Sequence, residues 1–197
     1  MFPVQFLRWL YINAVPPRIK RAYKRTQIKL HPRPMMSHQE IQLLDSILTS
    51  PFVHCVLEIG SGGSTLYFPT RHPVDWHSVE FNPSWYQDIR ELAPGNVQLY
   101  LLEDIPAFVA QFSPRAKEFQ VVLIDGPEDN RERVIEAIRD WDTDALVLLH
   151  DSHRRVYERA LSAYFRCVHL SAGEFARPGG GYKARGLSLL MSARPRP

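Results

Sequence analysis

Acidic residues and glycines follow several apolar runs of the chain, and their types and spacing could bind a small molecule. The densest group is EIGSGGS at residues 58–64, an acid followed by a glycine-rich turn. Single acids follow later apolar runs in the same way, at Glu80, Asp104, Asp125 and Asp151. Buried carboxylates need a partner, so acids around a glycine turn favour a ligand that is cationic or rich in hydroxyl groups.

Three kinds of nucleotide ligand compete for the glycine turn. A Walker loop is excluded, because no Gly-Lys-Ser/Thr sequence follows the turn. The dinucleotide fingerprint G-x-G-x-x-G begins at Gly60 and Gly62 but meets Thr65 in place of the third glycine. In addition, Glu58 would repel a pyrophosphate. S-adenosylmethionine carries no phosphate and offers a sulfonium, an ammonium, ribose hydroxyls and an adenine, so the turn favours this ligand over NAD.

Alternating strand-like and helical segments should position these acids. Ser37 and Glu40 have the spacing of a capping box, which predicts a helix over residues 37–48. The alternation that follows indicates a doubly wound α/β fold with a mostly parallel sheet, helices on both faces and an antiparallel C-terminal hairpin. In such a sheet ligands bind at the carboxyl ends of the strands, where these acids stand. The predicted strands are residues 52–59, 76–81, 97–102, 119–125, 145–151, 166–175 and 186–193, and the other predicted helices are 83–93, 105–112, 130–141 and 153–165.

Chain length and charge distribution predict one domain with a basic extension. At 197 residues the chain suits a single core, which we place at residues 37–197, after an N-terminal arm over residues 1–36. Residues 1–38 hold 8 of the 24 Lys and Arg residues and none of the 21 acids. Aromatic residues precede this cationic stretch. Such an arm could pack on the domain, lie on an anionic membrane surface or contact nucleic acid.

Composition also bounds the compartment. The chain contains no run of about 18 apolar residues that could span a bilayer. Cys55 and Cys167 each lie in an apolar run, which fits small buried thiols in a reducing compartment better than a disulfide framework. We therefore expect a cytoplasmic protein whose arm could reach the inner membrane surface.

At the glycine turn the sequence resembles the class I S-adenosylmethionine-dependent methyltransferases. The first motif of this family is an acid, any residue, and then glycines at alternate positions, and residues 58–64 match it with Ser64 in place of the third glycine. The resemblance covers roughly residues 40–192. It implies a Rossmann-like sheet of seven strands and S-adenosylmethionine as the cofactor.

The same resemblance implies specific cofactor contacts. Gly60 and Gly62 would let the backbone approach the methionine part, and Glu80 would bind the ribose hydroxyls. Asp104 would hold the adenine amino group, with Ile105 beside the ring. The full set of implied cofactor-binding residues is Glu58, Gly60, Ser61, Gly62, Ser64, Glu80, Phe81, Asp104, Ile105 and Asp125.

The second half of the chain indicates the kind of acceptor. Residues 121–138 contain IDGP followed by an arginine, and residues 148–165 contain HDSHR. These stretches are similar to the IDGP…R and HDxxR stretches of polysaccharide-modifying O-methyltransferases of the glucuronoxylan methyltransferase type. The resemblance implies methyl transfer to a hydroxyl of a sugar, a glycan or a related small molecule.

Two other functional classes stay open. A non-catalytic binding or scaffold protein could retain the fold if Asp125 and Asp151 served only as caps. A nucleic-acid methyltransferase would draw on the basic arm. However, DGPE at residues 125–128 replaces the Asn-Pro-Pro-Tyr/Phe signature of amino-methylating enzymes, which disfavours a nucleic-acid partner.

Methyl transfer needs a base for the proton of the acceptor oxygen. Asp125 and Asp151 should lie on adjacent strand ends, where repulsion could raise the pKa of one carboxyl. His150 and His153 are alternative bases, as neutral imidazoles at working pH. Metal-dependent O-methyltransferases of the catechol and macrolide-sugar types keep two magnesium-binding acids at the positions of Asp125 and Asp151. Because Ser152 stands where their third ligand often lies, a divalent metal such as Mg²⁺ stays open.

Two basic segments could recognise the acceptor. Arg131 follows Asp125, and the glycine-rich loop RPGGGYKARG at residues 177–186 could form a lid or a solvated hairpin turn. Their cations could bind a uronate or a phosphate-bearing sugar, so we expect a small-molecule or glycan acceptor that is anionic. The candidate substrate-binding residues are Arg131, Arg177, Tyr182, Lys183 and Arg185.

Overall fold

The structure is a computed structural model that describes residues 32–126, 128–171, 173–175 and 183–192, together with residues 16, 19, 26 and 28. Most of the N-terminal arm lies outside the described residues, so its contacts stay a prediction. Within the described part of the chain, no helix is both long enough and apolar enough to cross a membrane.

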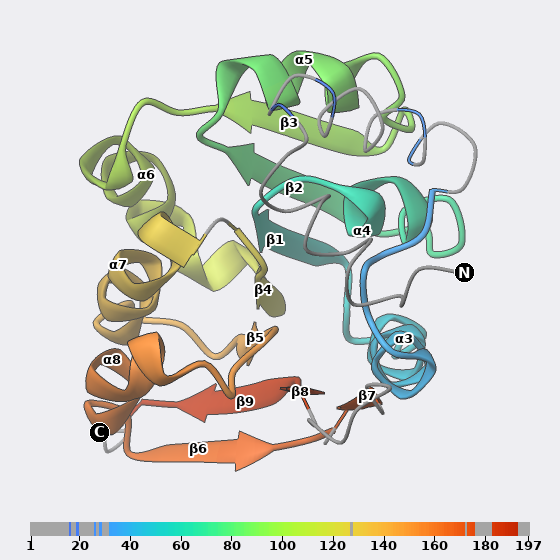
Figure 1. Ribbon diagram of the computed structural model, residues 1–197. Helices are drawn as coiled ribbons and strands as arrows, with labels where there is room; N and C mark the ends of the chain where they lie inside the picture. The colour runs from blue at the N-terminus through green and yellow to red at the C-terminus, as the bar shows by residue number, and fades with distance from the viewer. Residues whose placement is uncertain are drawn as a thin grey trace.

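Seven strands form one sheet in the order β3-β2-β1-β4-β5-β9-β6 (Figure 1). Strands β1 to β5 run parallel to one another, whereas β9 pairs antiparallel with β5 and β6. Strands β7 and β8 form a separate ribbon. The predicted doubly wound fold and its antiparallel hairpin are therefore confirmed. The bounds are β1 (Cys55–Ile59), β2 (Asp75–Glu80), β3 (Val97–Leu101), β4 (Val121–Ile124), β5 (Leu146–Leu149), β6 (Arg166–His169), β7 (Gly173–Phe175), β8 (Lys183–Arg185) and β9 (Ser188–Met191).

Helices cover both faces of this sheet. Helices α6, α7 and α8 lie along one face, at the left of Figure 1, and α3 and α4 lie on the other. The helices among the described residues are α3 (His38–Leu48), α4 (Gly63–Tyr67), α5 (Pro83–Arg90), α6 (Ile105–Phe112), α7 (Glu128–Arg139) and α8 (Glu158–Ser162), with 3₁₀ helices η1 (Ser113–Glu118) and η2 (Arg155–Tyr157).

Apolar side chains of the central strands alternate between two core layers. In β1, Leu57 and Ile59 join the layer beneath α6, α7 and α8, whereas Val56 joins the layer beneath α3. Strand β4 repeats the pattern, with Val122 in the first layer and Val121 in the second. A parallel strand that is buried on both faces needs apolar residues throughout, which explains the continuous apolar runs in the sequence.

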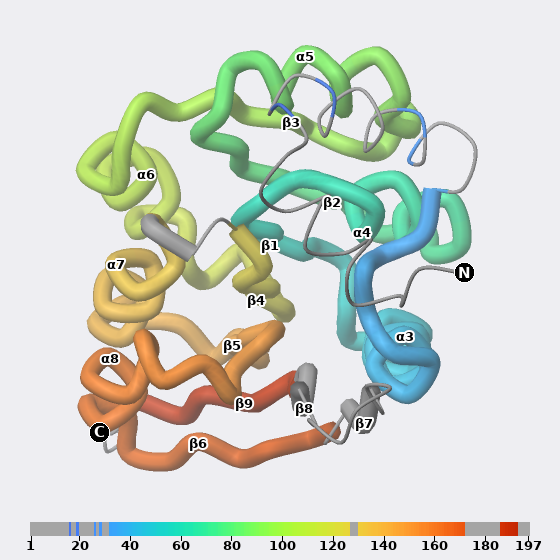
Figure 2. The backbone as a smooth tube through the Cα atoms, in the orientation of Figure 1, coloured from blue at the N-terminus to red at the C-terminus, as the bar shows by residue number. Residues whose placement is uncertain are grey.

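The chain passes over the glycine turn before it enters α3. The Ser37 hydroxyl accepts a hydrogen bond from the Glu40 N–H at 3.2 Å, and the Glu40 carboxylate accepts one from the Ser37 N–H at 2.6 Å, so the capping box is confirmed. A Cβ on Gly63 would lie 2.1 Å from the Arg33 carbonyl oxygen, which requires glycine there. Figure 2 shows this segment, in blue, beside α4. Residues 33–34 therefore pack directly on the turn.

Several predicted elements differ from the observed ones. The short helix α4 was not predicted, because its Ser and Thr side chains turn inward and leave no apolar stripe. The helix predicted over residues 153–165 is replaced by η2 and α8, which follow a turn in which the Arg154 N–H donates to the Asp151 carbonyl at 3.3 Å. Cys55 and Cys167 have free thiols and pack against the core layer beneath α6, α7 and α8, but each is only partly buried.

Candidate functional site

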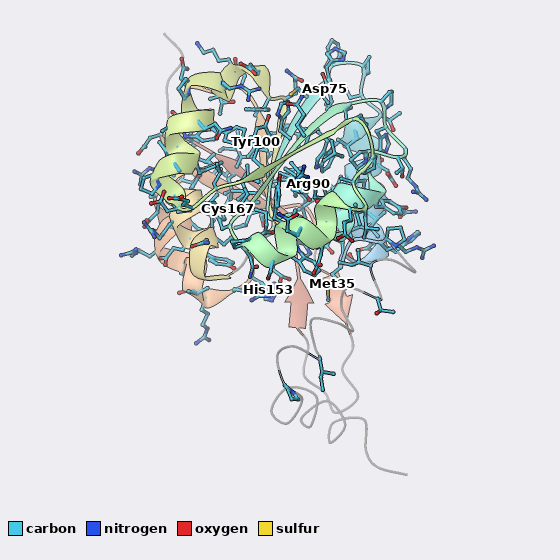
Figure 3. All side chains as sticks on the ribbon, turned by 90° about the horizontal axis from the view of Figure 1, so that it is seen from above. Met35, Asp75, Arg90, Tyr100, His153 and Cys167 are labelled. Atoms are coloured by element: carbon cyan, nitrogen blue, oxygen red, sulfur yellow. The ribbon has the colours of Figure 1, made fainter. Side chains whose placement is uncertain are left out.

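The acids that follow β1 to β5 share one edge of the sheet, because these strands are parallel. Figure 3 shows Met35 and His153 at this end of the molecule and Asp75, the first residue of β2, at the opposite end. We call the first end the carboxyl edge. It carries Glu58, Glu80, Asp104, Asp125 and Asp151.

Glu58 is fully buried and holds the glycine turn. Its Oε2 accepts hydrogen bonds from the hydroxyls of Thr65 and Ser78, at 2.6 and 2.7 Å, and from Trp76 Nε1 at 2.9 Å. Its Oε1 accepts a hydrogen bond from Ser64 Oγ. Burial raises the pKa of Glu58, and these neutral donors only partly oppose that effect. The carboxylate joins α4 to β1 and β2, and its contact with a cofactor stays a prediction.

The glycine turn exposes backbone at the carboxyl edge. Gly60 has a φ of +101°, and a Cβ there would lie 2.2 Å from Gly126 Cα, so this glycine lets the ends of β1 and β4 meet. A Cβ on Gly62 would meet no atom within 4 Å, which leaves room for a ligand beside the backbone. The Ser61 carbonyl accepts a hydrogen bond from Trp85 Nε1 at 2.8 Å, which anchors the turn to α5. Gly62 thus fits the implied approach, and Gly60 has a packing role.

Glu80 ends β2 and is only 2% exposed. Its Oε1 accepts hydrogen bonds from the N–H groups of Phe81 and Asn82, both at 2.8 Å. Its Oε2 accepts one from Ser61 Oγ at 3.0 Å. Backbone donors therefore fix the orientation of the carboxylate. Oε1 thus already accepts two hydrogen bonds, and Oε2 can accept one more, so the group fits a ligand hydroxyl such as one of ribose.

Asp104 and Ile105 stand at the start of α6. Asp104 is exposed, and its Oδ1 accepts a hydrogen bond from the Ala107 N–H at 2.9 Å as the helix N-cap. Ile105 is 6% exposed and belongs to the core layer beneath α6. The cap uses one carboxylate oxygen, so contact with an adenine amino group would use the other and stays a prediction.

A buried arginine joins the ends of β4 and β5. The Arg131 side chain extends from α7 and is 6% exposed. Its Nε donates to the Gly126 carbonyl at 2.9 Å, Nη1 donates to the His150 carbonyl at 2.9 Å, and Nη2 donates to Asp125 Oδ1 at 3.1 Å. Nη1 also lies 4.0 Å from Asp151 Oδ2. This geometry makes Arg131 a residue that positions the two acids, and its contact with an acceptor stays a prediction.

Asp151 has a left-handed backbone, with φ of +57°, and is 7% exposed. Its Oδ2 forms an ion pair with Arg154 Nη2. Burial alone would raise the pKa of Asp151, but the charges of His150, Arg154 and Arg131 lower it below its ordinary value. The expected rise of a carboxyl pKa through repulsion from Asp125 is therefore wrong for Asp151, because cations lie beside both acids.

His150 lies between two carboxylates. Its Nδ1 is 2.8 Å from Asp125 Oδ1, and its Nε2 is 3.7 Å from Oε1 of Glu40, a fully buried residue of α3. Burial alone would lower the pKa of His150, but Asp125, Glu40 and Asp151 raise it to about 10. His150 is therefore an imidazolium at neutral pH. The expectation of a neutral imidazole base is wrong for this residue.

The sequence did not identify Glu40 and Arg154 as members of the site. The capping box accounts for Glu40 at the start of α3, but no local pattern shows that this helix packs its first turn against β5. Arg154 had a signal, because Asp151 and Arg154 have the spacing of an ion pair across one turn. That spacing lies within the HDSHR stretch.

The remaining predicted residues are placed only in part. His153 is exposed near the end of β5. Ser152 Oγ lies 2.7 Å from Ser188 Oγ, which joins the end of β5 to β9. Lys183 and Arg185 belong to β8, but their side chains are outside the described part, as are Arg177 and Tyr182 altogether. Substrate contacts of the glycine-rich loop therefore stay a prediction.

The two implied metal ligands do not fit a magnesium ion. Asp125 Oδ1 already contacts His150 and Arg131, and Asp151 Oδ2 is paired with Arg154. Magnesium needs about six oxygen ligands at about 2.1 Å in octahedral geometry. The described residues contain no group of three or more His, Cys, Asp or Glu side chains suited to hold one metal ion.

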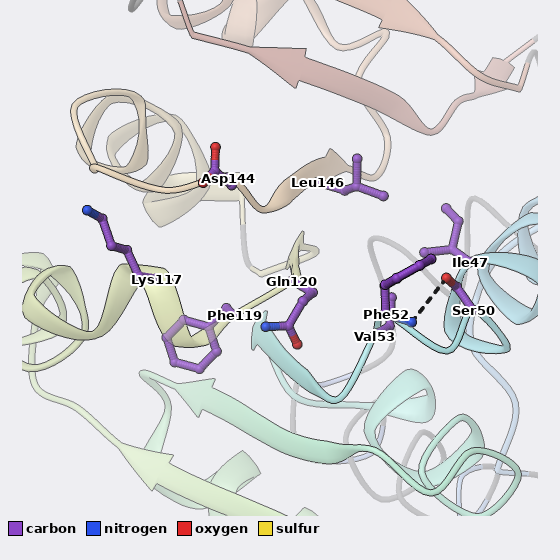
Figure 4. Close-up of a pocket in the computed structure, with 9 residues that line it drawn as sticks. All are labelled: Ile47, Ser50, Phe52, Val53, Lys117, Phe119, Gln120, Asp144 and Leu146. Atoms are coloured by element: carbon purple, nitrogen blue, oxygen red, sulfur yellow. Dashed lines mark hydrogen bonds between the residues drawn. The ribbon is translucent and has the colours of Figure 1, made fainter. Parts of the chain in front are cut away.

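A cavity of about 490 Å³ lies at the opposite edge of the sheet (Figure 4). Gln120, just before β4, accepts hydrogen bonds there from the N–H groups of His54 and Cys55 at 3.1 and 2.9 Å. Phe52 is 80% exposed beside it. The cavity brings together none of the predicted site residues. Its lining consists of Ile47, Ser50, Phe52, Val53, Lys117, Phe119, Gln120, Asp144 and Leu146.

Comparison with known proteins supports the fold assignment. No protein-family model matches the chain, and no curated protein sequence matches it. An O-methyltransferase from Bacillus cereus, solved in complex with SAH, matches with a TM-score of 0.59 at 15% identity, covering 93% of this chain and 96% of that one. A TehB-like SAM-dependent methyltransferase from Corynebacterium glutamicum matches with a TM-score of 0.55 at 14% identity, covering 90% and 100%. The chain thus has the Rossmann-like fold of these methyltransferases.

Proposed function

We propose that the chain is an S-adenosylmethionine-dependent O-methyltransferase that acts on a hydroxyl of a sugar, a glycan or a related small molecule. The observation that carries the cofactor assignment is the arrangement of Gly62 and Glu80 at neighbouring strand ends. An open backbone position lies beside a buried carboxylate that backbone N–H groups hold in place. This arrangement occurs in a fold shared with SAM-dependent methyltransferases.

The residues of the chain contribute mainly alignment, which is the largest demand of methyl transfer. S-adenosylmethionine, when bound, supplies an electrophilic methyl group and keeps the electrons of the broken carbon–sulfur bond on its sulfur. Glu80 would accept hydrogen bonds from the ribose hydroxyls, and the backbone at Gly62 would lie along the amino-acid part. The carboxyl end of β5 would then face the acceptor oxygen.

We assign Asp151 as the base that takes the acceptor proton, with Asp125 as its neighbour on β4. Ion pairing lowers the pKa of Asp151, so it is a weak base at neutral pH. A weak base suffices when the hydroxyl becomes strongly acidic as its oxygen bonds to carbon. The proton would therefore leave during or after formation of the new carbon–oxygen bond.

The acceptor class and the cellular location are further parts of this proposal. A sugar or glycan hydroxyl rests on the resemblance of residues 121–138 and 148–165 to polysaccharide O-methyltransferases. An anionic acceptor would pair with the basic residues of the glycine-rich loop. A cytoplasmic protein with its arm at the inner membrane surface would account for the charge of residues 1–36. Co-sedimentation of the full chain with anionic vesicles, compared with a variant lacking residues 1–33, tests the arm.

Calorimetric titration tests the cofactor. We expect micromolar binding of S-adenosylmethionine and S-adenosylhomocysteine and no binding of NAD. Transfer of a radiolabelled methyl group to glucuronic acid, a sugar nucleotide or catechol then tests the acceptor class. Binding of NAD alone, or of none of the three ligands, would contradict the proposed function.

A non-catalytic scaffold protein is the second candidate. The ion pairs of Asp125 with Arg131 and of Asp151 with Arg154 favour it, because engaged acids stabilise a fold whether or not they act on a ligand. This candidate predicts that S-adenosylhomocysteine binds while no probe is methylated. It also predicts that Asp151→Asn changes stability alone.

A further inference from the structure

Arg131 lies where a metal ion would have to lie to bridge the acids at the ends of β4 and β5. Its Nη2 is 3.1 Å from Asp125 Oδ1, and its Nη1 is 4.0 Å from Asp151 Oδ2. We propose that this guanidinium permanently takes the place of a divalent cation between Asp125 and Asp151, and that this chain transfers methyl groups without a metal ion. The second half of this proposal rests on the proposed function.

The contacts of Arg131 hold its guanidinium in place. Nε donates to the Gly126 carbonyl and Nη1 to the His150 carbonyl, both at 2.9 Å, and Nη2 also donates to Gly126. The guanidinium carbon lies 5.7 Å from the centre of the Tyr157 ring. These partners come from both strand ends and from η2. Moving the side chain away would leave two buried carbonyls without their donors and would remove one of the two partners of Asp125 Oδ1, which opposes displacement by an ion.

The charges of this cluster are balanced without a metal. Asp125, Asp151 and Glu40 supply three negative charges, while Arg131, Arg154 and the His150 imidazolium supply three positive ones. The two arginines stay protonated at every physiological pH, so their charges do not vary. A dication placed between the acids would lie within a few ångströms of the guanidinium and would be repelled by it.

The chemistry of methyl transfer is complete with these groups. The acceptor oxygen forms the new bond to carbon with its own electron pair, the carbon–sulfur pair stays on sulfur, and the acceptor proton passes to Asp151. No electron or charge is left for a metal to take up. Arg131 touches neither the acceptor nor the cofactor in this scheme, so it is a positioning residue: it fixes the two carboxylates at a constant separation.

Binding of Mn²⁺, followed by electron paramagnetic resonance on metal-stripped protein, tests the proposal directly. Wild-type protein should bind no Mn²⁺ up to millimolar concentration, and its methyl transfer should persist in excess chelator. Arg131→Met opens the position between the two acids, so we expect this variant to bind Mn²⁺ at least about tenfold more tightly than wild type. Arg133→Met is the matched control on the exposed side of α7 and should resemble wild type.

Each result decides the question. Micromolar Mn²⁺ binding by wild type that is lost in Asp125→Asn would overturn the proposal, as would methyl transfer that stops in chelator and returns with Mg²⁺. A folded Arg131→Met that gains no affinity would also overturn it. If that variant does not fold, Arg154→Met, at a half-exposed position, takes its place and should gain a weaker affinity for Mn²⁺. Failure of S-adenosylhomocysteine to bind would instead reject the proposed function, since the Mn²⁺ measurement needs no cofactor.

Discussion

The two halves of the carboxyl edge hold their acids in different ways. At β1 and β2, hydroxyls, an indole N–H and backbone N–H groups surround Glu58 and Glu80. At β4 and β5, cations surround Asp125 and Asp151. Burial accordingly raises the pKa of Glu58, whereas cations lower that of Asp151. Acidic side chains at one edge of the sheet therefore lie in two different electrostatic environments.

This difference suits the two ligands of the proposed methyl transfer. None of the ion pairs among the described residues involves Glu58 or Glu80. Glu58 is fully buried and holds the glycine turn, so Glu80 is the carboxylate that the half at β1 and β2 can present to a ligand. The half at β4 and β5 neutralises its own acids. An anionic acceptor can approach that half without meeting unpaired negative charge.

Asp151→Asn should have the largest effect, because it removes the assigned base while keeping the shape of the site. Asparagine tolerates the left-handed backbone at this position, so the fold should persist. We expect kcat to fall by about 10²–10⁴-fold, with the affinity for S-adenosylhomocysteine nearly unchanged. Radiolabelled methyl transfer to the acceptor probes measures the first, and calorimetry measures the second.

Asp75→Asn is the matched control for this change. Asp75 is an exposed aspartate at the opposite end of the sheet, so its substitution should leave both quantities as in wild type. A fully active Asp151→Asn protein would remove Asp151 from the mechanism. It would also show that the cationic half serves stability alone.

Glu58→Leu should have the next largest effect, and that effect should be on stability. The change leaves the donors of Ser64, Thr65, Trp76 and Ser78 without their acceptor inside the core. A buried donor without a partner costs about 1–3 kcal/mol, so the free energy of unfolding should fall by about 3 kcal/mol or more. Urea unfolding measures this loss.

An exposed glutamate provides the control for Glu58. Glu103→Leu changes the same side chain at the surface and should shift the free energy of unfolding by less than about 0.5 kcal/mol. Equal losses in the two variants would mean that the hydrogen bonds to Glu58 contribute nothing beyond those of a solvated carboxylate.

The sequence predicts the half of the carboxyl edge at β1 and β2 better than the half at β4 and β5. An acid, a glycine turn and a second acid at the next strand end are local signals, since each depends on residues close in the chain. Continuous apolar runs in β1 and β4 likewise indicate a parallel sheet. The parallel pairing of β1 and β2 then brings Glu58 and Glu80 to one edge, as expected.

The half at β4 and β5, where cations surround the acids, is formed by contacts between elements that are far apart in the sequence. The spacing of residues along the chain does not show such contacts. Glu40 meets His150 only because α3 packs its first turn against the end of β5. Arg131 was expected to bind an acceptor, but it extends from the first turns of α7 and donates to the Gly126 carbonyl. The pKa of His150 follows from these long-range contacts, which is why a neutral base was the natural and wrong expectation from sequence.

Glu80→Ala should weaken the binding of S-adenosylmethionine without unfolding the protein. It removes the carboxylate assigned to the ribose hydroxyls, and charge-assisted hydrogen bonds of this kind are worth about 1–3 kcal/mol. The dissociation constant measured by calorimetry should rise accordingly. Glu103→Ala, near the end of β3, should bind as wild type does, and unchanged affinity in Glu80→Ala would reject the ribose contact.

The pH dependence of stability should separate the two halves by sign. The pKa of Glu58 is raised in the folded state. Its contribution to the free energy of unfolding is therefore full at pH values below its unfolded pKa of about 4.3, and it is lost as pH rises through the folded pKa. The pKa of Asp151 is lowered, so its contribution is present above its unfolded pKa of about 3.9 and is lost as pH falls through the folded pKa.

Urea unfolding of wild type, Glu58→Gln and Asp151→Asn across the acid range measures both contributions. The stability difference between wild type and Glu58→Gln should shrink as pH rises above about 4.3, and the difference between wild type and Asp151→Asn should shrink as pH falls below about 3.9. Neither slope should exceed about 1.4 kcal/mol per pH unit, because one proton is involved in each. If the two stability differences changed with pH in the same direction, both acids would lie in the same kind of electrostatic environment. The contrast between the two halves of the carboxyl edge would then be wrong.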